Sequence, residues 1–164
     1  MNAKAYLNQP GLPETAPEFR SAQLDALTAL ADSWVAGGRP TGQQIASWKP
    51  SELQVYLQKL PRKLTQADCA WLDAHFQLMG RGNHEILVEW LTLAATADYE
   101  PAFPRIREVL LRVGRMKYLR PLYGALAGSP RTRALAREIF AAASPGYHGL
   151  SRRVVQSVLE AYPA

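Results

Sequence analysis

The sequence predicts an all-α fold, with a two-layer α-solenoid as the favoured architecture. Apolar residues recur at spacings of three and four in one segment after another, which is the period of an amphipathic helix. Glycine and proline end these segments after roughly 10 to 18 residues, and no stretch alternates apolar and polar residues for long enough to predict a strand. We therefore expect about eight or nine helices joined by short turns.

The N-terminal part divides into a proline-rich segment and a first helix. Residues 1–18 contain three prolines, which forbid a continuous helix and predict an extended lead-in. Residues 19–164 are then one helical domain. Its first helix is predicted over 19–36 and ends at Gly37. The expected apolar face of this helix consists of Leu24, Leu27, Leu30, Ala31 and Trp34.

Three helices are predicted in the next stretch, over 42–47, 50–60 and 65–78. Pro50 suits the first turn of the second helix, where a missing N–H is tolerated. Thr65, with an acidic residue three positions on, is a good N-cap for the third. The expected core residues are Leu53, Tyr56, Leu57 and Leu60 in the second helix, and Ala70, Trp71, Ala74, Phe76 and Leu78 in the third.

Two further helices are predicted over 83–97 and 100–112. Asn83 is a suitable N-cap for the first, and Pro104 fits the first turn of the second. The expected core residues are Ile86, Leu87, Trp90, Leu91, Leu93 and Ala94 in the first helix, and Phe103, Ile106, Val109 and Leu110 in the second.

The last three helices are predicted over 115–127, over 130–143 and after an N-cap at Ser151. Pairing 83–97 with 100–112, and likewise the next two helices, gives a unit of roughly thirty residues, the length of a helix-pair repeat. A compact irregular bundle is the competing arrangement. The expected core residues of the last two helices are Leu135, Ala136, Ile139, Phe140, Val154, Val155, Val158 and Leu159.

The net charge of +5 is unevenly distributed. Residues 1–100 carry 8 Lys/Arg and 11 Asp/Glu, whereas residues 101–164 carry 11 and 3. A basic half favours a nucleic acid or an acidic ligand as partner, or a polar face docked on an acidic neighbouring domain. The tyrosines near Arg115 and Arg120 lend only weak support to nucleic-acid binding, so nucleic acid is a disfavoured partner.

Several chemistries lack the residues they need. His84 begins an H-E-x-x-H pattern, but Val88 stands at the second histidine position, so we expect no metal or other cofactor in this chain. The single cysteine, Cys69, has no base on its helical face and is predicted to be a small buried residue, which makes the cytoplasm the default location. No apolar run approaches the roughly 20 residues that span a bilayer, so we expect no membrane partner.

The most informative stretch is residues 114–123. It places Arg115 and Lys117 at the predicted start of a helix, where the helix dipole is already positive. Two cations are unfavourable there, which suggests that an anion binds. A guanidinium presents a planar fork to a carboxylate, and a lysine adds a point charge. The alternative is that both lie on a polar face or pair with Glu108 or Glu138.

A set of short motifs follows one another along the chain. They are Pro10-Gly11-Leu12-Pro13, Asn83-His84-Glu85-Ile86, Trp90-Leu91, Tyr99-Glu100-Pro101-Ala102, Pro104, Gly114-Arg115-Met116-Lys117-Tyr118, Arg120-Pro121-Leu122-Tyr123 and Pro145-Gly146-Tyr147-His148. In order and spacing they resemble the C-terminal helical domain of leukotriene A4 hydrolases, which are zinc aminopeptidases of the gluzincin type. The resemblance covers essentially the whole chain.

The resemblance implies a two-layer right-handed superhelix of α-helices, like armadillo repeats, that packs against its own catalytic domain and helps wall a substrate cleft. It implies that Arg115 binds the carboxylate of the peptide substrate and that Lys117 assists. Residues 1–18 would be the lead-in from the catalytic domain. That domain, its zinc and the catalytic residues are missing here, so the chain would not be catalytic alone.

One residue departs from the family pattern. Glu89 stands where the family often carries arginine, which reverses the local charge.

The second hypothesis for function is a free-standing α-solenoid module that binds a protein or RNA through its basic half.

Overall fold

The computed structural model describes residues 21–163, which form nine α-helices and four short 3₁₀ turns. The all-α prediction is confirmed, and the proposed lead-in, residues 1–18, lies outside the described residues. The α-helices are α2 (Ala22–Asp32), α3 (Gly42–Ser47), α4 (Pro50–Lys59), α5 (Gln66–Phe76), α6 (His84–Thr96), α7 (Phe103–Arg112), α8 (Met116–Gly128), α9 (Arg133–Ala143) and α10 (Gly149–Glu160). The 3₁₀ turns are η1 (Ser33–Ala36), η2 (Leu78–Gly80), η3 (Glu100–Ala102) and η4 (Ser144–Gly146).

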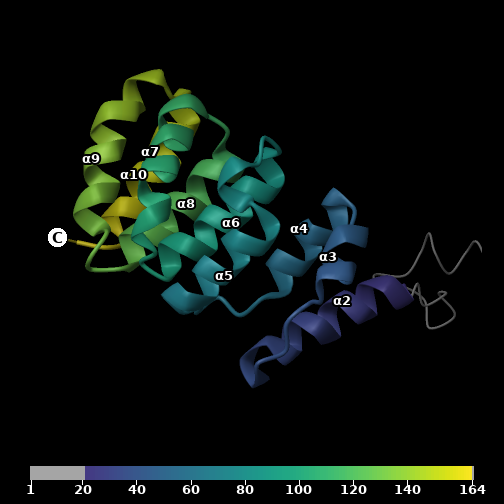
Figure 1. Cartoon of the computed structure of the whole chain (residues 1–164). Coiled ribbons are helices and arrows are strands. Elements are labelled where there is room, and N and C mark those ends of the chain that lie inside the picture. Colours follow the sequence, from purple (N-terminus) through teal and green to yellow (C-terminus); the bar gives the residue numbers. More distant parts are fainter. Residues whose placement is uncertain (1–20, 164) are drawn as a thin grey trace, which may run out of the picture.

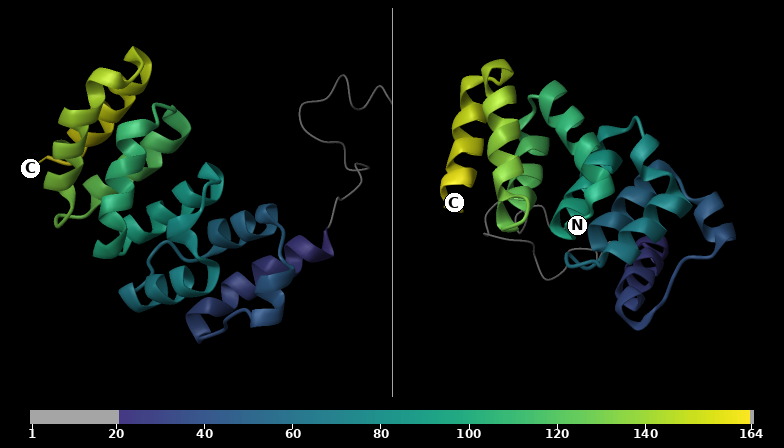
Figure 2. Two further views of the ribbon diagram at one scale, coloured as in Figure 1. Left: turned by 45° about the horizontal axis from the view of Figure 1, so that its top comes forward. Right: turned by 60° about the vertical axis from the view of Figure 1, so that its left-hand side comes forward.

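The helices are arranged in two layers. In one layer α2, α4, α6, α8 and α10 pack on one another in that order, and in the other α3 packs on α5 and α7 on α9. The earliest and latest helices lie at opposite ends of the molecule (Figures 1 and 2). The predicted pairs α6–α7 and α8–α9 do form, but α8 packs more extensively on its neighbours within the layer, α6 and α10. This is the two-layer superhelix that the sequence predicts.

Helix starts follow local hydrogen-bonding rules. Thr65 and Asp68 form a capping box, in which the threonine hydroxyl accepts the Asp68 N–H and the carboxylate accepts the Thr65 N–H. The Asn83 side chain accepts the Glu85 N–H at 2.9 Å and caps α6. Pro50 occupies the first turn of α4, as expected.

The core is continuous along the stack and rich in aromatic rings. Trp90, Tyr56 and Tyr123 are its largest fully buried side chains. Trp34 is buried and packs edge-to-face on both Tyr56 and Trp71. Because Trp48, which follows α3, and the tryptophans of α5 and α6 also pack within or against this core, the sequence-based preference for core packing over ligand stacking is confirmed.

The predicted apolar face of α5 is only partly correct: Phe76 is buried and Trp71 packs against the core as expected, but the two predicted alanines lie outside it. Ala70 and Ala74 are exposed, and the buried residues are Cys69, Leu72 and Phe76. Both sets have helical spacing, so periodicity alone did not distinguish them. The helix also ends earlier than predicted, because Gln77 has a left-handed backbone with φ of 52°.

The predicted N-cap of the last helix is also wrong. His148 caps α10, and its Nδ1 accepts the N–H of Leu150 at 3.2 Å. Ser151 lies inside the first turn, where its hydroxyl donates to the Gly114 carbonyl at 3.1 Å. This bond ties α10 to the residue just before α8, so the serine serves a tertiary contact instead of a local cap.

Candidate functional site

Arg115 and Lys117 lie at the start of a helix, as the sequence predicts. Arg115 is the N-cap residue of α8, and the helix begins at Met116. The Arg115 side chain has no acceptor, so it makes no capping hydrogen bond to the first turn. The backbone N–H groups of this turn therefore add positive potential to that of the two side chains.

The Arg115 guanidinium is largely available to a ligand. The residue is exposed, and its Nη1 donates one long hydrogen bond, 3.5 Å, to the hydroxyl of Tyr118. The central guanidinium carbon lies 5.4 Å from the centre of the Tyr118 ring, within cation–π distance. Arg115 forms no ion pair with any carboxylate in the part of the chain that the structure describes.

Lys117 differs from Arg115 because it has an internal partner. Its Nζ lies 2.6 Å from Glu85 Oε2 across the α6–α8 contact. The other oxygen of Glu85 accepts the Tyr118 hydroxyl at 2.8 Å. The alternative stated above, internal pairing, therefore holds for Lys117, but its partner is Glu85. The two glutamates suggested as partners are engaged elsewhere, Glu108 by Arg105 and Arg112 and Glu138 by Arg107.

The Glu85 carboxylate is stabilised in its charged form. The hydrogen bond from Lys117 lowers the pKa of Glu85 most, followed by the hydrogen bond from Tyr118, and the charge of Arg115 contributes in the same direction. Glu85 also lies in the first turn of α6, where a negative charge is favoured by the helix dipole. The negative charge of Glu85 at the start of α6 thus compensates the positive charge of Lys117 at the start of α8.

Three residues of this cluster were not identified as site residues from the sequence. Glu85 and Tyr118 hold Lys117 and Arg115, and the ring of His84 stacks near that of Tyr118 with centres 6.1 Å apart. Glu85 and Lys117 are 32 positions apart, so only the packing of α6 against α8 brings them together. The only sequence signal was an acidic residue in the first turn of α6, which is common at any helix start.

Most of the basic half of the chain is used within the fold. Besides Lys117, four arginines pair with carboxylates, namely Arg105, Arg107, Arg112 and Arg131. Three more donate to backbone carbonyls near helix ends, namely Arg133, Arg137 and Arg152. The remaining three, Arg115, Arg120 and Arg153, are exposed and pair with no described carboxylate. The free positive charge is therefore much smaller than the composition suggests.

The residue that departs from the family pattern has a structural partner. Glu89 accepts a hydrogen bond of 2.6 Å from Arg62, which lies just after α4. The reversed charge at position 89 therefore joins two helices of the same layer, and it is not paired with Arg115 or Lys117.

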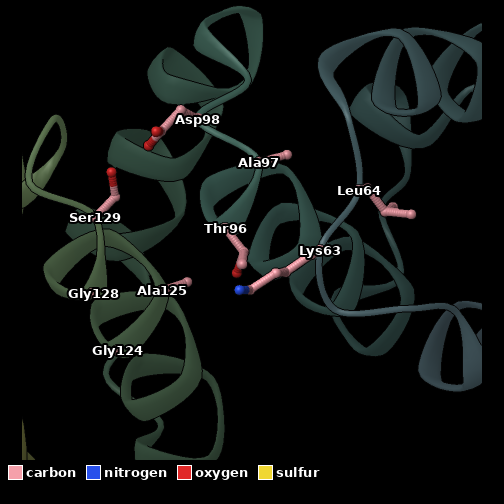
Figure 3. Close-up of a pocket in the computed structure, with 9 residues that line it drawn as sticks. All are labelled: Lys63, Leu64, Thr96, Ala97, Asp98, Gly124, Ala125, Gly128 and Ser129. Carbon is pink, nitrogen blue, oxygen red and sulfur yellow. The ribbon is translucent and has the colours of Figure 1, made fainter.

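Two hollows adjoin α8. One, of about 490 Å³, lies between α8 and α10 and is lined by Lys117 and Arg120 together with Pro121, Leu150 and Val154. The other, of about 520 Å³, lies at the far ends of α6 and α8. There Lys63 extends its ammonium group toward Thr96 (Figure 3). Because the helix starts meet at Glu85 and Lys117 while the helix ends share this hollow, α6 and α8 run side by side in the same direction.

Residues 21–163 contain no group of three or more His, Cys, Asp or Glu side chains that could hold a metal ion. Cys69 is completely buried, and burial, with a smaller effect from the charge of Asp68, raises the pKa of its thiol to about 12. A protonated, inaccessible thiol is not a nucleophile. Among the described helices, none combines the length and apolar character needed to cross a bilayer.

Comparison with known proteins points to one family. The family model described as "Leukotriene A4 hydrolase, C-terminal" matches residues 48–159, which is more than half of the chain. Leucine aminopeptidase 2 of Pyricularia oryzae is 30% identical over 154 residues, covering 92% of this chain and 25% of the relative. Aminopeptidase B of Mus musculus is 28% identical over 165 residues, covering 94% of this chain and 25% of the relative. The chain thus spans about a quarter of the length of these relatives.

Solved structures have the same fold. Native yeast LTA4 hydrolase matches with a TM-score of 0.78 at 23% identity, and the match covers 97% of this chain and 29% of the yeast chain. The yeast enzyme in complex with bestatin matches with a TM-score of 0.74. Taken with the match of the family model, these findings show that the chain belongs to the leukotriene A4 hydrolase C-terminal domain family.

Proposed function

We propose that this chain is the helical C-terminal domain of a zinc aminopeptidase, in which it forms part of the wall of the substrate cleft and binds the carboxylate of the peptide substrate through Arg115. The observation that carries the proposal is the state of the Arg115 side chain. It is exposed, and it makes one long hydrogen bond to Tyr118 and no ion pair within the described residues. Most other arginines of the basic half are committed to internal partners.

The surroundings of Arg115 suit a carboxylate. Its guanidinium can donate two parallel hydrogen bonds to the two carboxylate oxygens. The first turn of α8 has no side-chain cap, so its backbone N–H groups can also face an anion. Lys117 assists, because an ammonium group has three donors and the bond to Glu85 uses one of them.

Binding the carboxylate would contribute to catalysis by positioning. A peptide held at its C-terminal end has its N-terminal peptide bond at a distance set by its length, so a short peptide of the right length places that bond at the catalytic centre. The zinc and the general base would be supplied by a catalytic domain outside residues 21–163, which have no cluster of metal ligands. That domain is the expected partner of the helical layers. We propose a cytoplasmic location because Cys69 is buried as a free thiol, and a free thiol needs no compartment in which disulfides form.

The test is Arg115→Ala in the full-length protein, with kcat/KM measured for a tripeptide. Because a hydrogen bond to a charged group contributes about 1.5–3 kcal/mol, we expect kcat/KM to fall by roughly 10- to 150-fold. Arg120→Ala is the matched control on the same helix and should change kcat/KM little. A tripeptide amide, which lacks the carboxylate, should be nearly insensitive to Arg115→Ala. An unchanged kcat/KM for the free tripeptide would contradict the anchoring role.

The alternative is a free-standing module that binds a protein or RNA. Reading the gene upstream of Met1 separates the two functions, since an H-E-x-x-H motif within the preceding few hundred residues supports the aminopeptidase. A salt-titrated RNA-binding measurement gives an independent answer, because strong salt-dependent affinity would favour the module.

A further inference from the structure

Both oxygens of the Glu85 carboxylate accept hydrogen bonds from the first turn of α8. Its Oε2 accepts from Lys117 Nζ at 2.6 Å, and its Oε1 accepts from the Tyr118 hydroxyl at 2.8 Å. Both donors reach it from a neighbouring helix of the same layer. Glu85 thus acts on the candidate site from across a tertiary contact.

The first effect of Glu85 is on the charge of the site. It cancels the charge of Lys117, so Glu85, Lys117 and Arg115 together carry a single positive charge. Arg120 lies about one turn beyond Lys117 along α8, and both residues line the hollow between α8 and α10. A ligand that approaches the start of α8 therefore meets the uncompensated charge of Arg115 with the Glu85 carboxylate nearby, and Arg120 lies further along the helix.

The second effect is on the orientation of Arg115. The Tyr118 hydroxyl has one proton, and it donates that proton to Glu85. Its lone pairs are then left to accept from Arg115 Nη1, which lies 3.5 Å away. Glu85 therefore orients the Tyr118 hydroxyl, and this hydroxyl accepts the hydrogen bond from Arg115 Nη1.

We propose that Glu85 is a specificity-determining residue, which makes the Arg115 site select peptides with a single terminal carboxylate over peptides whose C-terminal residue is Asp or Glu. This rests on the proposed carboxylate-binding function of Arg115. The first carboxylate of an acidic terminal residue binds Arg115, but the second meets the negative charge of Glu85, which also compensates the charge of Lys117. An uncharged terminal residue meets no such repulsion.

The experiment titrates the 164-residue chain with acetyl-Ala-Ala, which carries one negative charge, and acetyl-Ala-Asp, which carries two. The NMR signals of the backbone amides of residues 115–119 report binding. Glu85→Gln removes the negative charge, while its amide oxygen still accepts from Tyr118. Two unit charges near 4 Å in water interact enough to change an affinity about fivefold. At low salt we expect the Glu85→Gln variant to bind acetyl-Ala-Ala about fivefold more tightly than the unaltered chain does, and acetyl-Ala-Asp about 25-fold more tightly. The ratio of the two affinities therefore shifts about fivefold in favour of acetyl-Ala-Asp.

Two further variants separate charge from structure. Lys117→Gln removes a positive charge, so the ratio should move about fivefold in the opposite direction. Tyr118→Phe removes the hydroxyl without changing charge, and it should weaken both dipeptides by the same factor. A role of Glu85 that is merely structural would move both affinities together in every variant.

Arg115→Ala distinguishes failure of this inference from failure of the proposed function. If Arg115→Ala weakens both dipeptides but Glu85→Gln and Lys117→Gln leave their ratio unchanged, Glu85 does not set specificity and the Arg115 anchor stands. If Arg115→Ala leaves both affinities unchanged, or the unaltered chain binds neither dipeptide, the anchor and the inference built on it are both overturned.

Discussion

Two buried tyrosines allow a prediction about stability that can be worked out from hydrogen-bond direction. The Tyr147 hydroxyl donates to the carbonyl of Leu110 at 2.6 Å, and the Tyr123 hydroxyl lies 3.0 Å from that of Tyr147. Tyr147 has only one proton, which Leu110 receives, so Tyr123 is the donor in the second bond. Burial raises the pKa of Tyr123 most, and donation to Tyr147 raises it further, in agreement with this direction. The Leu110 carbonyl lies in the last turn of α7, where a helix cannot satisfy its own carbonyls.

Because of this direction, Tyr147→Phe should cost more than Tyr123→Phe. The first change leaves two buried groups without partners, the Leu110 carbonyl and the Tyr123 hydroxyl. At about 1–3 kcal/mol for each, and with some relaxation, we expect a loss of about 2–4 kcal/mol. The second change removes a donor but leaves Tyr147 bound to Leu110, and should cost about 0.5–1.5 kcal/mol. Combined, the two changes should cost less than the sum of the single changes, since Tyr123 is then no longer stranded.

Urea denaturation followed by circular dichroism at 222 nm measures these differences. If the slope of the free energy of unfolding against urea concentration is unchanged, each variant unfolds in the same way. Tyr162→Phe is the control, because that tyrosine is exposed and should have little effect. If Tyr123→Phe costs as much as Tyr147→Phe, or if the two changes are additive, the assignment of donor and acceptor is wrong.

Two other predictions follow from the charges and the cysteine. Hydrogen bonds are the largest cause of the lowered pKa values of Glu85, which accepts from Lys117, and of Glu108, which accepts from Arg105. These two carboxylates therefore stabilise the folded state at pH values above their unfolded-state pKa of about 4.3. This stabilisation is lost as the pH falls through their lower folded-state pKa values. The urea midpoint should therefore drop between about pH 5 and pH 3, with a smaller drop in Glu85→Gln, and an identical drop in that variant would exclude a contribution from Glu85. Because Cys69 is buried and its thiol pKa is raised to about 12, iodoacetamide should modify it in urea but not in the native protein, as mass spectrometry can measure. Rapid modification under native conditions would show that α5 opens or that the thiol is exposed.

Most of the fold could be predicted because its determinants are local. The capping pair Thr65 and Asp68, the N-cap Asn83 and the prolines in first turns act within one helical turn, so the sequence marks them directly. The exposure of Ala70 and Ala74 in α5 could not be predicted, since these two residues have the same spacing as a true core face. Which side of a helix is buried depends on its neighbours, as the buried Leu72 of α5 illustrates.

The candidate site also has one part that local sequence predicts and one part that depends on the packing of helices. The position of Arg115 and Lys117 at the start of α8 depends on local signals, so it could be predicted from the sequence, as could the all-α class and the family. The pairing of Lys117, and the lack of a carboxylate partner for Arg115 among residues 21–163, became visible only in the packed fold. The reason is that Glu85, 32 positions from Lys117, is brought to it by the packing of α6 on α8, and no pattern within either helix encodes that distance. Local sequence sets where a charge stands along a helix, whereas packing between helices sets which charge it meets.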